Sequence, residues 1–106
     1  MNTRTKTTPT RRQELLKASA RAVLDLLAVG FTLDSVTIPL IASNVGFSSV
    51  YISTRVGLQE AKAEAVKVGL IEKHPHLLAQ LALSGDRRVK KMDPMELVKA
   101  FRAAIA

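Results

Sequence analysis

The sequence predicts an all-α fold, a five- or six-helix domain containing a helix-turn-helix. Its 106 residues are 47% hydrophobic but only 4% aromatic, so Leu, Val, Ile and Ala must form the core, and segments rich in Ala and Leu favour helix. Apolar residues in these segments recur at helical spacing, and cap-forming residues precede several of them. A chain of this length suffices for one modest core, which predicts a single domain.

The composition excludes several classes of protein. The chain contains no Cys, so disulfides and thiolate-bound metals are excluded. The first dozen residues are polar and basic, unlike a signal peptide, and no segment reaches the roughly 18 uninterrupted apolar residues of a membrane span. We therefore expect a soluble, cytoplasmic, nucleoid-associated protein with no membrane partner. The net charge of +7 favours anionic partners, with nucleic acid first.

Residues 1–9 are predicted to form a flexible basic arm. They are hydrophilic and carry Arg4 and Lys6, and Arg11 and Arg12 continue the positive charge into the helix that follows. Such an arm either contacts phosphates or an adjacent minor groove, or is only a solvated tail. The residues favour neither alternative.

The single helical domain is predicted over 10–106. Its first helix starts at Thr10, which fits a capping box with Gln13, and stops at Gly30. One side of this helix is apolar and the opposite side is charged. The apolar side consists of Leu15, Leu16, Ala20, Ala22, Val23, Leu26 and Leu27. We expect this long helix to pack across the helix-turn-helix.

A short second helix is predicted over 38–44. It follows a segment of turn and cap formers, and Thr37 is expected to be its cap. Pro39 falls in the first turn, where a missing N–H does no harm.

A tight turn and a third helix complete the helix-turn-helix over about 38–56. Gly46 can adopt the positive φ that such a turn often requires. Ser48 can then cap a helix from Ser49 to about Val56.

The side chains around this turn suit a shared core. Ala42 is small where the two helices must cross, and Phe47 is expected to bury its ring under the turn. Ile52 reaches back into the core one helical turn after the cap. Arg55 stands where the usual pattern has a buried aliphatic residue, so either Val56 takes that place or the helix is rotated slightly.

Four small side chains remain on the outward surface of the third helix: Ser49, Val50, Ser53 and Thr54. In a helix-turn-helix protein this helix enters the major groove, and its first residues touch base edges. The alternative is an ordinary helical hairpin that serves only as scaffold. The positive net charge favours the groove-reading interpretation.

The segment from Leu15 to Tyr51 resembles the three-helix DNA-binding head of TetR-type and homeodomain-like bacterial regulators. The matching pieces are Gly30-Phe31-Thr32, Val36-Thr37, Ile41-Ala42 and Val45-Gly46-Phe47-Ser48. The chain departs from the TetR pattern where Ser53 and Val56 replace an aromatic pair, and it is too short for that family's ligand-binding domain. The resemblance therefore implies DNA binding without a small-molecule ligand, and small phage and plasmid regulators match better in size.

Two further helices are expected after Gly57. The first covers about 58–68, and its apolar face consists of Leu58, Ala61, Ala65 and Val68. The second covers 75–83. His74 and His76 precede it, and two histidines without another suitable ligand make a poor metal site, so we interpret them as a polar loop.

The C-terminal part combines a basic cluster with an amphipathic helix. The cluster, interpreted as a loop, contains Arg87, Arg88, Lys90 and Lys91, and either contacts phosphate beside the recognition helix or is solvated. The last helix begins at Asp93-Pro94. Its apolar face consists of Met95, Leu97, Val98, Phe101 and Ile105, and is expected to pack on the domain or to form a homodimer contact.

No arrangement typical of an enzyme is found. The nine acidic residues are scattered singly, and there is no phosphate-binding glycine loop or Cys nucleophile. Both histidines lie together, away from any candidate Ser nucleophile. We expect no enzymatic activity, no cofactor and no metal.

Together these observations predict a sequence-specific double-stranded DNA-binding protein. We expect a dimeric transcriptional repressor on an inverted-repeat operator of a phage, plasmid or bacterial operon. The alternatives are a DNA-packaging or replication accessory such as a small terminase subunit, and a non-DNA helical adaptor. The predicted base contacts are Ser49, Val50, Ser53 and Thr54. The predicted phosphate contacts are Arg4, Lys6, Arg11, Arg12, Ser48, Tyr51, Arg55, Arg87 and Arg88.

Overall fold

The computed structural model describes the backbone of residues 2–105 and the side chains of residues 12–105. Within that range the chain is built of α-helices without strands, which confirms the predicted all-α class. The helices are α1 (Asn2–Ala28), α2 (Ile38–Val45), α3 (Ser49–Arg55), α4 (Leu58–Glu72), α5 (Pro75–Leu83), α6 (Arg87–Lys90) and α7 (Pro94–Ile105). None of the helices in this range is long and apolar enough to cross a membrane.

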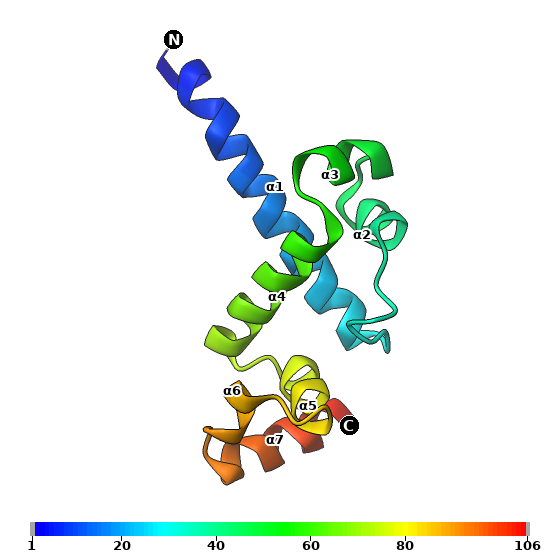
Figure 1. The fold of residues 1–106 in the computed structure, drawn as a ribbon, viewed down its shortest axis with the longest axis vertical. Coiled ribbons are helices and arrows are strands. Elements are labelled where there is room, and N and C mark those ends of the chain that lie inside the picture. Colours follow the sequence, from blue (N-terminus) through cyan, green and yellow to red (C-terminus); the bar gives the residue numbers. More distant parts are fainter. Residues whose placement is uncertain (1, 106) are drawn as a thin grey trace.

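Helices α1 and α4 form the central pair of the fold (Figure 1). The α2–α3 hairpin packs on one side of α1, and α5, α6 and α7 gather at the end of the molecule away from α3. The molecule is elongated, with principal dimensions of 50 × 27 × 22 Å.

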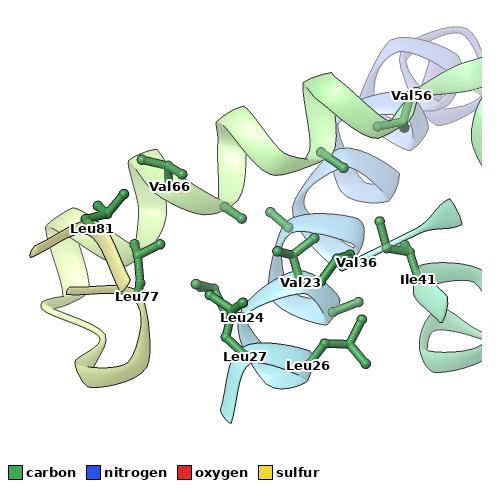
Figure 2. Close-up of a cluster of buried hydrophobic side chains, with 14 of the residues drawn as sticks. Val23, Leu24, Leu26, Leu27, Val36, Ile41, Val56, Val66, Leu77 and Leu81 are labelled. Carbon is green, nitrogen blue, oxygen red and sulfur yellow. The ribbon is translucent and has the colours of Figure 1, made fainter. Parts of the chain in front are cut away.

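The hydrophobic core follows α1, where Val23, Leu24 and Leu27 are at most 1% exposed. Figure 2 shows Val23 on the side of Ile41 from α2, and Leu24 on the side of Leu77 from α5. All five belong to one continuous cluster of buried residues. The first helix therefore carries both the α2–α3 hairpin and the C-terminal helices, as its apolar side predicts.

Small residues allow α4 to lie close to its neighbours. Ala61 and Ala65, predicted on its apolar face, are completely buried. A Cβ atom on Gly69 would overlap Cδ2 of Leu77 and would lie 3.1 Å from Cδ2 of Leu24. A side chain at position 69 would therefore have to displace Leu77 where α1, α4 and α5 meet.

Helix α1 starts earlier than the sequence predicts. It begins at Asn2, so the predicted start at Thr10 is wrong, and the backbone of residues 2–9, predicted as part of a flexible arm, is helical. A capping box is a local preference of about 1 kcal/mol, and it does not prevent a helix from continuing through it.

Helix α4 also continues beyond its predicted end near Val68. It reaches Glu72 and ends at Lys73, whose φ of 55° is left-handed. Gly69 stays inside the helix because its missing side chain admits Leu77. A glycine in a helical pattern is ambiguous in sequence, since it marks either a helix end or a close contact.

The basic cluster at residues 87–91 is mostly helical and was wrongly predicted as a loop. Asp86 caps this single-turn helix, α6, by accepting a hydrogen bond from the N–H of Arg88 at 2.9 Å. With α6, the described residues form seven helices instead of the five or six predicted.

Fewer residues of α7 pack against the core than the sequence predicts. Ala100 is buried against the core, and Leu97 packs partly against it. Met95, Val98 and Ile105 are 63%, 41% and 83% exposed, so packing on the domain, the first of the two predicted alternatives, does not hold for these three residues. The second alternative, a homodimer contact, stays a prediction. These three residues therefore form an exposed apolar side of α7.

We predict that Gly69→Ala lowers the free energy of unfolding by about 1–3 kcal/mol, because the added methyl group must displace Leu77 or separate the helices. Urea unfolding measures the loss. Leu77→Ala alone should cost about 2–5 kcal/mol, and the double variant should lose less than the sum, since the new methyl group enters the vacated space. Strictly additive losses would contradict the close contact.

Candidate functional site

The turn between α2 and α3 has the predicted backbone conformation. Gly46 has a φ of 94°, and its N–H donates to the carbonyl oxygen of Ala42 at 2.8 Å. The N–H of Phe47 donates to the same carbonyl oxygen at 3.2 Å. Thr37 stands at the predicted N-cap position of α2, but its side chain accepts no cap hydrogen bond.

Helix α3 begins where the sequence predicts. The Oγ atom of Ser48 accepts a hydrogen bond from the N–H of Tyr51 at 3.1 Å and so caps the helix. Ile52 is completely buried and Val56 is 5% exposed, while Arg55 lies on the surface. Val56 thus supplies the aliphatic contact that Arg55 cannot make, as expected.

Phe47 does not bury its ring under the turn, and that prediction is wrong. The side chain is 49% exposed and stacks on Tyr51, with ring centroids 4.9 Å apart. Ile41 and Ile52 are completely buried and already fill the core beneath the turn. The Phe47 ring is therefore left on the outside of the hairpin.

Three of the four predicted base-contacting side chains lie fully on the surface of α3. Val50 is 71% exposed, Ser53 and Thr54 are exposed, and Ser49 is half-buried. The Oγ1 of Thr54 donates to the carbonyl oxygen of Val50 at 2.7 Å, and the Oγ of Ser53 donates to the same oxygen at 3.3 Å. These four side chains are small and uncharged, and Nη1 of Arg55 reaches their edge, where it donates to Oγ1 of Thr54 at 3.4 Å.

Beside it lies a cation–aromatic stack that sequence reasoning missed, formed by Phe47, Tyr51 and Arg55. The guanidinium carbon of Arg55 lies 3.9 Å from the centre of the Tyr51 ring. The two rings also line a shallow groove against Glu14, Leu15 and Ala18 of α1. Tyr51 and Arg55, both predicted phosphate contacts, therefore lie together on one side of α3. The four-residue spacing of positions 47, 51 and 55 could have predicted this stack, because residues four apart lie on the same face of a helix.

Arg12, a predicted phosphate contact, is held by an acidic residue of α4. Its guanidinium donates to both carboxylate oxygens of Glu60, at 2.6 and 2.7 Å. The side chains are 49% and 42% exposed, so the pair is a surface ion pair that contributes at most about 1 kcal/mol. The side chains of Arg4, Lys6 and Arg11 lie outside the described residues.

The basic cluster is not brought beside α3. Helix α6, which carries Arg87 and Arg88, lies with α5 and α7 at the opposite end of the molecule (Figure 1). The guanidinium of Arg88 is bound by Asp86, with Nη2–Oδ2 at 2.7 Å and Nε–Oδ1 at 3.0 Å. Because α5 turns the chain away from α4, the expected juxtaposition with α3 does not form.

His74 serves as a helix cap. Its Nδ1 accepts a hydrogen bond from the N–H of Leu77 at 3.4 Å, at the start of α5. Partial burial, followed by the charge of His76, lowers the pKa of His74, which keeps the ring in the neutral form that can accept this bond.

No protein-family model, curated protein or solved structure matches this chain. A functional assignment therefore depends on the geometry and charge of the surface just described.

The hydrogen bonds from Arg88 predict a measurable titration. The side chain of Arg88, and then its backbone N–H, lower the pKa of Asp86 to about 2 from an ordinary 3.8. A lowered carboxyl pKa stabilises the folded state above the ordinary pKa, and that stabilisation is lost as the pH falls from about 4 toward 2. Carboxyl-carbon NMR should therefore find Asp86 titrating near 2. In Arg88→Ala the pKa should rise toward 3.8, whereas an unchanged pKa would contradict the pairing.

Proposed function

We propose that this chain is a sequence-specific double-stranded DNA-binding protein that represses transcription as a dimer. The observation that carries the proposal is the presentation of α3. Its inner residues Ile52 and Val56 are locked in the core, and its outer residues Val50, Ser53 and Thr54 are exposed. A helix held in this way, after a tight turn, has the shape that helix-turn-helix proteins insert into the major groove.

The distribution of positive charge supports the proposal. The chain carries a net charge of +7, and the part of α1 that contains Arg4, Lys6 and Arg11 lies toward the same end of the molecule as α3 (Figure 1). Arg55 and Tyr51 lie on the flank of α3, where a groove-bound helix meets the sugar-phosphate backbone. Phosphate contacts from these positions would hold α3 in its register on the duplex.

A dimer would read an inverted repeat with its two copies of α3 about 34 Å apart, one helical turn of DNA. Such a complex over a promoter excludes polymerase, which is the proposed mechanism of repression. The exposed apolar side of α7 supports self-association. Light scattering should give a mass of two chains. A ring of many copies would favour a DNA-packaging accessory instead.

We predict that Ser53→Ala combined with Thr54→Ala relaxes sequence preference with little loss of helicity. Selection from random duplexes should enrich one motif for the parent chain, and the double variant should lose much of that enrichment because two groove-facing hydroxyls are gone. Ser84→Ala is a matched control, since its hydroxyl also bonds a carbonyl three residues back, at 2.9 Å, but far from α3. Failure of the parent chain to enrich any motif would refute the proposed function.

Releasing Arg12 should strengthen DNA binding. In Glu60→Gln the guanidinium is freed from its carboxylate partner, so we predict tighter binding to all duplexes and a salt dependence steeper by about one phosphate contact. Glu64→Gln removes the same charge from α4 but leaves the Arg12 pair in place. Equal effects of the two variants, measured by titrations at several salt concentrations, would show that Arg12 does not reach phosphate.

A further inference from the structure

The outward surface of α3 presents methyl groups and hydroxyl groups, and the hydroxyl hydrogens of Ser53 and Thr54 are bonded within the helix. Both Thr54 and Ser53 donate to the carbonyl oxygen of Val50, at 2.7 and 3.3 Å. The Ser53 oxygen still offers its lone pairs outward, and the Thr54 oxygen offers the one that remains after it accepts from Nη1 of Arg55 at 3.4 Å. Val50, at 71% exposure, is the most prominent apolar group on this helix.

Arg55 is the one long donor on α3, and its guanidinium is engaged at the edge of this surface. It lies over the Tyr51 ring at 3.9 Å, and its Nη1 donates to Oγ1 of Thr54 at 3.4 Å. At 100° per residue, position 55 is about 140° around the helix from Val50. Around Val50 the described side chains therefore place no bidentate donor of the kind that reads the O6 and N7 acceptors of guanine.

We propose that this surface selects thymine, through contact of Val50 with the C5-methyl group, and disfavours guanine at the neighbouring positions. In the major groove thymine alone carries a methyl group, while adenine N6 and cytosine N4 supply donors for the Ser53 and Thr54 oxygens. Guanine would present two acceptors near Val50, where the described side chains place no bidentate donor. The inference rests on the proposed function, because it names the bases that the DNA-binding helix reads.

The experiment replaces thymine by deoxyuridine, one position at a time, in a duplex enriched by the parent chain. The change removes only the methyl group, so one position in each half-site should bind about fourfold more weakly, the effect of losing one buried methyl-sized group. Val50→Ala should bind the thymine duplex more weakly and should no longer distinguish thymine from uracil at that position. Val29→Ala is the matched control, because Val29 is 73% exposed but lies at the end of α1, and it should keep the fourfold discrimination.

The outcomes separate this inference from the function beneath it. If the parent chain binds one motif tightly but every uracil duplex binds equally well, the thymine contact is overturned while DNA binding stands. The contact is overturned in the same way if Val50→Ala still discriminates thymine from uracil. If the chain prefers no duplex at all, the proposed function fails first. Circular dichroism of Val50→Ala checks that the exposed substitution leaves the helices intact.

Discussion

The close approach of α1 and α4 is the constraint on which the rest of the fold depends. It requires small residues on α4, and Ala61, Ala65 and Gly69 supply them. With α4 lying this close, one side of α1 is left to receive the α2–α3 hairpin, and Leu77 of α5 can reach Gly69. Ion pairs from Arg12 and Arg21 to α4 span the surface edge of the same contact, but each is half-exposed and adds little.

This arrangement separates what holds α3 from what α3 presents. Ile52 and Val56 determine where the helix sits, and changing them would disturb the core. Val50, Ser53 and Thr54 make no contribution to that core. These side chains can therefore be substituted with little effect on the free energy of unfolding, which suits a helix proposed to discriminate between DNA sequences.

Local signals in the sequence predicted the turn well. They did not predict how side chains pack against residues that are distant in the sequence. Gly46 and Ser48 act through bonds to residues within one turn, so they located the ends of α2 and α3 to within a residue. The ring of Phe47 could lie under the turn or on Tyr51. The choice depends on how completely Ile41 and Ile52 fill the core, which spacing does not reveal. The same holds for Gly69, whose role depends on Leu77 from another helix.

The position of α7 would restrict the shape of the proposed dimer if the two chains associate through this helix. Its exposed apolar side lies near one end of a 50 Å molecule, and α3 lies toward the other end. Two copies joined through α7 with their long axes in one line would hold their α3 helices too far apart to bind adjacent turns of one duplex. If the two chains associate through α7 and their α3 helices bind adjacent turns of one duplex, the long axes of the protomers must meet at a small angle, so that the dimer is V-shaped.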